Sequence, residues 1–308
     1  MDISSAIGLL TISSAVTLFG IKINNRFILK QNYNNSNNKF KNCAITYNDG
    51  TKKEEILNEV KYIISENFNN NIQKLVSIAR EEVNKRALEL QIDLIKQISE
   101  FSEERFVKFI ELFKTPAYQY SLIEAQKTYA IHGDVNKKNI LLGLLLKKTE
   151  EKNETLTDIG INIAIETIKK ITKKQIDFMS LFYVVYWSFS ENGTEKEFKD
   201  FALKVIKPFL NNIPINANNA KHLEELNLLR FYTNKFLSPY EVLITNHKLQ
   251  NLSANDLKQL MFLWDEDFKK LDILENTQGF QITQIAEIIC RSNVSALTGI
   301  NLPIRINE

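Results

Sequence analysis

The chain has 308 residues, enough for one large domain or two modest ones with a hydrophobic core. Hydrophobic residues make up 44% and charged residues 25%, and only nine glycines and five prolines occur, which disfavours a fold with many tight turns. The net charge of +2 gives no reason to expect nucleic acid as a partner, and the two cysteines and three histidines are too scattered to predict a metal site. No cofactor is expected.

The first predicted element is apolar, since no charged residue occurs from Ile3 to Ile21. This length is just enough for a transmembrane helix. Lys22, Arg26 and Lys30 follow it, which predicts a bacterial inner-membrane protein whose main body is cytoplasmic. The residues expected to face the bilayer are Ile7, Leu9, Leu10, Ile12, Val16, Leu18 and Phe19. The alternative for residues 1–23 is a helix packed in the domain or on its surface, in a cytoplasmic protein.

An asparagine-rich tract follows at residues 24–50, with nine asparagines between Asn24 and Asn48. It holds two short strand-like runs, Phe27–Leu29 and Phe40–Tyr47. Asparagine-rich β segments can stack with identical copies through side-chain amides. The tract is therefore either a self-assembly element or a polar linker.

A helical domain is predicted at residues 51–190. Thr51 is the expected N-cap, with Glu54 at the capping-box position. An apolar stripe then predicts one or two long helices that reach Glu100, with the break at Asn69–Asn71. Further helices are predicted over 102–114, 118–131, 136–148, 157–170 and 172–189, with Ser102, Thr157 and Thr172 as N-caps. The last of these is so densely apolar that we expect it at the centre of the domain.

Residues 191–308 are predicted to form a C-terminal helical subdomain. Its helices are expected over 195–212, 219–237, 253–275 and 281–298. The predicted fold class is thus all-α: a multi-helix domain with a long N-terminal amphipathic helix, preceded by a possible transmembrane helix and a short asparagine-rich β segment.

One segment imitates the active site of a kinase. Residues 132–141 fit the pattern HxDxxxxNIL, in which Asp134 would be the catalytic base and Asn139 would hold magnesium. Asp158 starts a DxG that offers a second metal ligand. However, residues 51–131 contain no glycine, so the glycine-rich phosphate loop is missing. The competing interpretation is a helix junction in which Gly133 ends one helix and Asp134 caps the next, with Lys137 and Lys138 on a solvated face.

Several stretches resemble a bacterial family of uncharacterised proteins that carry only locus-tag names. The matching stretches are Ala125–Ala130 with Gly133 and Asp134, Leu141–Leu146, Ile171–Ile176, Gly279–Ile289 and Leu297–Gly299. The resemblance covers roughly residues 32–306, and the apolar segment at 3–21 departs from it. It implies a helical domain, but no catalytic residues are assigned in the family, so none carry over.

The leading hypothesis is a non-enzymatic, membrane-tethered helical protein that self-associates through its N-terminal quarter. Its helical body would bind a protein partner or sense a signal. Bacterial proteins that join one membrane segment to an assembly tract often serve stress or anti-phage responses, which is an analogy only. The alternatives are an atypical phosphotransferase that uses Asp134, Asn139 and Asp158, and a soluble helical adaptor.

Overall fold

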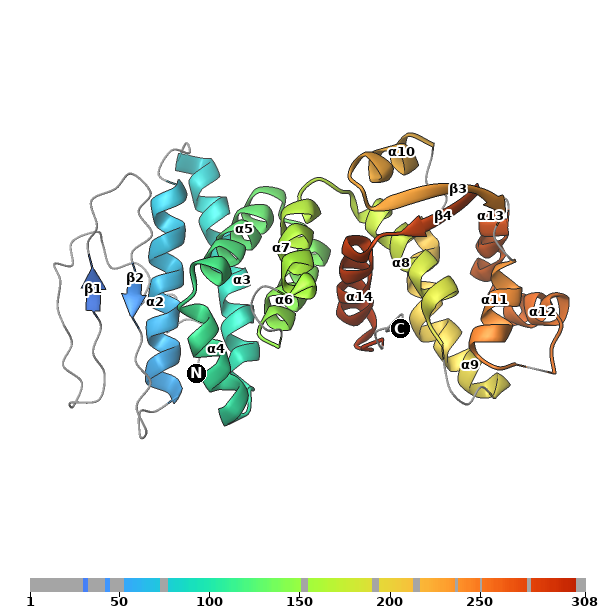
Figure 1. Cartoon of the computed structure of the whole chain (residues 1–308), viewed down its shortest axis with the longest axis horizontal. Helices are drawn as coiled ribbons and strands as arrows, with labels where there is room; N and C mark the ends of the chain where they lie inside the picture. Colours follow the sequence, from blue (N-terminus) through green and yellow to red (C-terminus); the bar gives the residue numbers. More distant parts are fainter. Residues whose placement is uncertain are drawn as a thin grey trace. The chain divides into compact units, whose positions relative to one another are not determined.

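The computed structural model describes residues 30–32, 42–44, 53–72, 77–150, 155–189, 194–212, 217–235, 238–249, 251–275 and 278–302. Within these ranges the chain forms thirteen α-helices, α2 to α14, and four short strands (Figure 1). The predicted all-α fold class is confirmed. The chain divides into two compact units, residues 1–63 and 64–308.

The first unit contains β1 (Lys30–Asn32), β2 (Asn42–Ala44) and the start of α2 (Lys53–Ile72). The two strands are antiparallel, with Lys30 opposite Ala44. β2 falls inside the second strand-like run of the sequence, and β1 begins directly after the first run. The apolar segment 3–21 and the expected cap at Thr51 lie outside the described residues.

α2 and α3 (Ser77–Ser99) are the two long helices that the apolar stripe predicts. The predicted break at Asn69–Asn71 is wrong by a few residues, because α2 continues through the asparagines to Ile72. On α3, Ala87 is buried beside Ala130 of α5. α3 thus belongs to the helical core of the second unit.

The five helices after α3 confirm the predictions with small shifts at their ends. They are α4 (Glu103–Phe113), α5 (Pro116–His132), α6 (Val135–Lys148), α7 (Leu156–Ile168) and α8 (Lys173–Trp187). Ser102 and Thr172 are N-caps as predicted. The N-cap of α7 is Thr155 rather than Thr157, because the helix begins two residues earlier and the Thr155 hydroxyl accepts from the Asp158 amide.

An aromatic cluster joins α4 to α5. Phe109 lies 5.7 Å from Phe113 and 5.9 Å from Tyr118, measured between ring centroids. The Phe109 and Tyr118 rings meet edge to face, a geometry that the ring quadrupoles favour. Burial of these rings also raises the pKa of Tyr118. The cluster fixes the α4–α5 corner without any charged group at its centre.

The predicted central helix is confirmed, since α8 is buried on all its faces from Gln175 to Tyr186. α14 (Gln284–Thr298) packs against it and against α6 and α7. It ends at Gly299, whose positive φ of 71° is the left-handed conformation of a helix C-cap. Gly160 of α7 lies close to α14, since an added Cβ would lie 2.7 Å from Cδ1 of Ile288.

The C-terminal third departs most from the sequence prediction. α9 (Glu195–Phe201) continues as a π-helix and then as a 3₁₀-helix to Asn212. These three segments together span the predicted helix 195–212. The predicted helix 219–237 is wrong beyond α10 (Ala217–Glu225), because residues 229–235 form β3. The remaining elements are α11 (Pro239–Asn246), α12 (Ala254–Trp264), a 3₁₀-helix (Glu266–Leu271), α13 (Asp272–Glu275) and β4 (Gln278–Ile282).

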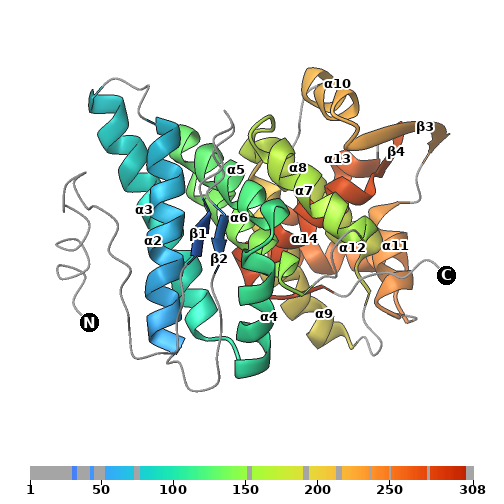
Figure 2. The same cartoon turned by 60° about the vertical axis from the view of Figure 1, so that its left-hand side comes forward.

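β3 and β4 form an antiparallel pair, and they lie side by side in Figures 1 and 2. Leu229 is opposite Ile282, and Phe231 is opposite Phe280. The Phe280 ring lies 4.1 Å from the ring of Phe182 on α8. This contact covers the middle of the central helix with two strands that are far apart in the sequence.

Candidate functional site

The His-Gly-Asp segment is a helix junction. Gly133 has a φ of 65°, and its N–H donates to the carbonyl of Tyr129 at 2.8 Å, which closes α5. The Asp134 carboxylate accepts from the backbone amides of Asn136 at 2.9 Å and Lys137 at 3.2 Å, which caps α6. Both residues therefore have the structural roles that the competing interpretation gave them.

The three residues of the kinase-like pattern do not meet. Asp134 caps the start of α6, whereas Asp158 contacts Lys148 at the end of α6. A helix of this length spans about 20 Å, so a base at one end and a metal ligand at the other cannot share a substrate. Asn139 lies between them, partly exposed. Over the described residues from 53 to 150 the chain contains helices only, with no strand to carry a phosphate loop.

One detail of that junction was predicted wrongly. Lys137 was expected on a solvated face, but it is buried, and burial lowers the pKa of its ammonium group. Lys138 forms an ion pair with Asp93 of α3 at 2.7 Å. The first turn of α6 is covered because α3, α5 and α14 all pack against this helix.

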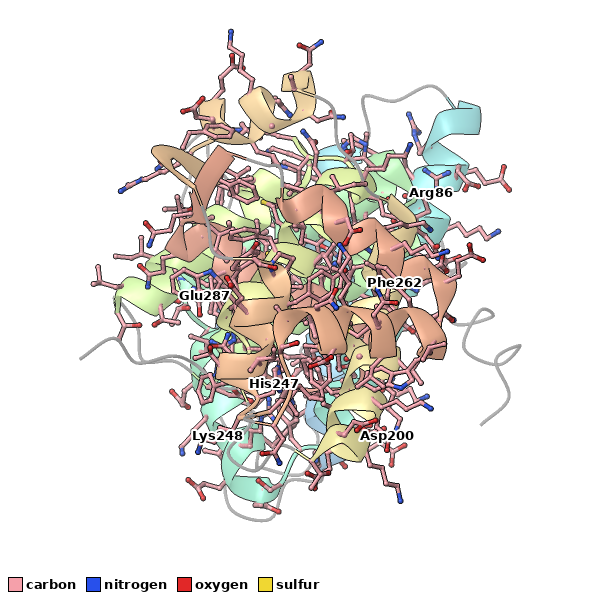
Figure 3. All side chains as sticks on the ribbon, turned by 90° about the vertical axis from the view of Figure 1, so that its right-hand side faces the viewer. Arg86, Asp200, His247, Lys248, Phe262 and Glu287 are labelled. Atoms are coloured by element: carbon pink, nitrogen blue, oxygen red, sulfur yellow. The ribbon has the colours of Figure 1, made fainter. Side chains whose placement is uncertain are left out.

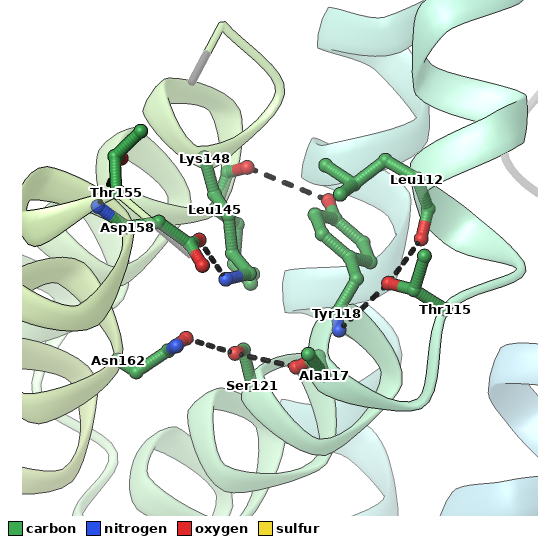
Figure 4. Close-up of polar contacts among 10 residues, drawn as sticks. All are labelled: Leu112, Thr115, Ala117, Tyr118, Ser121, Leu145, Lys148, Thr155, Asp158 and Asn162. Atoms are coloured by element: carbon green, nitrogen blue, oxygen red, sulfur yellow. Dashed lines mark hydrogen bonds and ion pairs between the residues drawn. The ribbon is translucent and has the colours of Figure 1, made fainter. Parts of the chain in front are cut away.

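Asp158 belongs to a buried polar centre between α5, α6 and α7 (Figure 4). Its carboxylate pairs with the ammonium group of Lys148, and both side chains are buried. Nearby, the Ser121 hydroxyl donates to Oδ1 of Asn162 at 2.7 Å. The Tyr118 hydroxyl lies 3.5 Å from the carbonyl of Leu145. The aspartate that the sequence pattern offered to a metal is thus held by a lysine.

A second buried polar network joins α6, α8 and α14, and it was not predicted from the sequence. Asn293 donates from Nδ2 to Asp177 at 3.2 Å and to Ser180 at 2.8 Å. Asn136 donates to Oδ1 of Asn293 at 3.1 Å. Lys173 pairs with Asp177 from the solvent side. The available signal was Asp177 and Ser180, one turn apart in an otherwise apolar helix.

His247 is a further buried titratable group, at the end of α11 (Figure 3). Its ring lies 4.6 Å from the Phe201 ring and 5.1 Å from the Phe198 ring. Burial in this apolar setting lowers its pKa to about 4. The neutral imidazole is therefore the form that the folded protein favours at neutral pH.

This shift predicts a pH dependence of stability. Above the ordinary histidine pKa of about 6.5 the stabilising contribution is fully present, and it is lost as the pH falls towards about 4, because the unfolded chain binds the proton more readily. We expect a loss of about 3 kcal/mol across that window. Urea unfolding from pH 7 to pH 4 measures it. His247→Gln, which stays neutral, should flatten this part of the profile, and an unchanged profile would contradict the assignment.

The main candidate binding surface is a row of exposed apolar side chains on α7. Leu156 is 76% exposed, Ile159 46% and Ile163 40%. Their spacing of three and four residues puts them on one face of the helix. Tyr120 of α5 is 46% exposed. Glu124 of α5 and Glu166 of α7 both raise its pKa, so the Tyr120 hydroxyl lies next to α7. We call these four residues the α7 row.

The α7 row is unusual because the opposite face of the same helix is also apolar. Ile161, Ala164, Ile165 and Ile168 are buried in the core. A helix that is apolar on both faces is normally buried on both. An unpartnered apolar face of this kind indicates an interaction site.

Neither a metal site nor a membrane-spanning helix is found among the described residues. Among the described residues, no group of three His, Cys, Asp or Glu side chains is placed to hold a metal ion. None of the described helices combines the length and the apolar character that a membrane crossing needs. The seven expected membrane residues, from Ile7 to Phe19, lie outside the described part of the chain.

Comparisons with known proteins identify a family but no activity. The comparison with curated proteins and the comparison with solved structures each found no match. The model of one family, whose uncharacterised members carry locus-tag names, matches residues 56–300. The match spans every helix from α3 to α14, so the chain belongs to this family.

Proposed function

We propose that this chain is a non-enzymatic, membrane-tethered helical protein that self-associates through its N-terminal quarter and binds a protein partner through its helical body. The observation that carries partner binding is the α7 row. The residues of the kinase-like pattern support the absence of catalysis, since Asp134 is used as a helix cap and Asp158 as half of a buried ion pair.

The partner of the α7 row is a protein with an apolar groove. Leu156, Ile159 and Ile163 have the i, i+3, i+7 spacing of anchors in helix-in-groove recognition. Four side chains offer much less than the roughly 1,200 Å² that a stable protein interface buries, so the row alone does not make a stable homodimer. A groove that wraps around α7 gains area on both flanks of the helix.

The tether and the self-association rest on the N-terminal sequence. The uncharged segment Ile3–Ile21 followed by Lys22 and Arg26 supports one membrane span with the body in the cytoplasm. The pairing of β1 with β2 inside the asparagine-rich tract supports a β-type contact between copies. A soluble adaptor would share the α7 row but lack the span.

Fractionation of cells that express the full chain tests the proposal. The full chain is expected in the membrane fraction and larger than a monomer after detergent extraction. A version that lacks residues 1–24 is expected in the soluble fraction. If both versions are equally soluble and monomeric, the tether and the self-association are wrong.

The phosphotransferase alternative makes a different prediction. It requires the full chain to bind magnesium–ATP and to lose that binding in Asp158→Asn. We expect no saturable nucleotide binding by the purified chain in isothermal titration calorimetry. A micromolar affinity that Asp158→Asn abolishes would favour the enzyme.

A further inference from the structure

The end of the bundle at the α7–α8 junction carries a cluster of lysines. Lys169, Lys170, Lys173 and Lys174 fall within six positions, and all four are exposed. We propose that this surface, the basic end, binds the anionic surface of a lipid membrane. The inference deepens the proposed function, because it gives the helical body its own contact with the membrane.

Two other helices bring residues to the basic end. α5 runs in the same direction as α7, since Ser121 bonds Asn162 at the middle of α7 and Glu124, one turn further along α5, pairs with Lys169 at the end of α7 at 3.1 Å. The C-terminal end of α5 and the α5–α6 turn therefore lie at the same end of the bundle as the α7–α8 junction. This places Lys127 and two exposed apolar residues, Ile131 and Val135, beside the lysines; they are 66% and 58% exposed.

Some lysines of the basic end are left without an acidic partner. Glu124 pairs with both Lys127 and Lys169, and Asp177 pairs with Lys173. Among the described residues, neither Lys170 nor Lys174 has an ion pair. Asp134 caps α6, and Glu166 contacts Tyr120. On α3, Glu82 pairs with Arg86, whose guanidinium donates to the carbonyls of Ala130 and Ile131, and Glu89 accepts from the Tyr129 hydroxyl. Lys170 and Lys174 are therefore the exposed lysines of this end whose charge is left for an outside partner.

This composition matches a membrane surface better than other anionic partners. Clusters of four to eight cations bind anionic phospholipids, with each lysine near the surface contributing about 1 kcal/mol. Exposed Ile131 and Val135 can enter the boundary between headgroups and acyl chains, as apolar residues of peripheral proteins do. Among the described residues of this end, Tyr120 is exposed near Lys169, but one ring does not provide the row of aromatic side chains on which successive bases of a single-stranded nucleic acid stack.

Vesicle sedimentation with the detergent-purified full chain tests the proposal. The probes are phosphatidylcholine vesicles and vesicles that also contain 30% phosphatidylserine. We expect tighter binding to the anionic vesicles than to the phosphatidylcholine vesicles. This difference in affinity should become smaller as the salt concentration is raised. Lys170→Gln with Lys174→Gln should weaken binding to the anionic vesicles about 30-fold, since two charges are lost.

The matched control is Lys196→Gln with Lys204→Gln, two exposed lysines on α9 and the π-helix that follows it. In Figure 1 these elements lie at the lower edge of the view, whereas the α7–α8 connection lies at the upper edge. This control should change binding less than twofold.

The proposal is overturned if the two vesicle types bind equally or if the two double variants weaken binding equally. The proposal is also overturned if the protein binds an RNA probe and shows no preference for the anionic vesicles. A chain without a membrane-spanning segment would give a different result. It would not bind phosphatidylcholine vesicles, but it would still bind the vesicles that contain phosphatidylserine.

Discussion

Lys148→Met is expected to lower the free energy of unfolding by about 3–5 kcal/mol, because it removes the ammonium group from the buried Asp158 carboxylate. The two charges lie between α6 and α7 with almost no access to water, so solvent cannot replace the lost partner. Chemical denaturation followed by far-ultraviolet circular dichroism measures the change.

The matched control removes both charges together. Lys148→Met with Asp158→Leu fills the same space with apolar groups, and it should restore most of the lost stability or exceed the wild type. A double variant as unstable as the single one would mean that Asp158 has a role beyond its ion pair. That outcome would reopen the interpretation of Asp158 as a functional residue.

Asn293→Leu is expected to cost about 2–4 kcal/mol, because it removes three hydrogen bonds from a buried network. The leucine has a similar size, so the loss reports on the polar contacts of Asp177, Ser180 and Asn136 rather than on a cavity. Guanidinium unfolding curves give the comparison.

Asn139→Ala on α6 is the control for this prediction. Asn139 is partly exposed and lies outside the network, so we expect a change within about 0.5 kcal/mol. Equal effects of the two substitutions would contradict the claim that the network stabilises the contacts among α6, α8 and α14.

The sequence predicted the elements whose causes are local. Gly133 and Asp134 stop and start helices through their own backbone conformation and side chain, so the α5–α6 junction could be derived from neighbouring residues. Thr172 was found for the same reason. The choice of Thr157 over Thr155 failed because the two candidate caps lie two residues apart, and the local sequence does not distinguish them.

Non-local contacts explain most of what the sequence did not predict. β3 pairs with β4, about fifty residues further along the chain, and no short window contains both strands. The Lys148–Asp158 pair crosses a helix junction, and the Asn293 network joins three helices. Each depends on a tertiary arrangement that periodicity does not describe.

The candidate binding surface illustrates a different limit. The residues of α7 are apolar on both faces, and periodicity cannot distinguish a fully buried helix from one with an unpartnered apolar face. Only the exposed fractions of Leu156, Ile159 and Ile163 reveal the row. At the basic end, Lys169 to Lys174 are close together in the sequence, whereas Lys127 of α5 joins them only in the folded bundle.

Site-specific photo-crosslinking tests the central claim, that the helical body is a binding module whose contact surface is the α7 row. A photoreactive residue would replace Ile159 or Ile163 in the full chain expressed in its native cells. The control position is Leu263 on α12, which is 82% exposed and equally apolar. We predict the same single protein adduct from both α7 positions and none from position 263, whereas no adduct, or identical adducts from all three positions, would contradict the account.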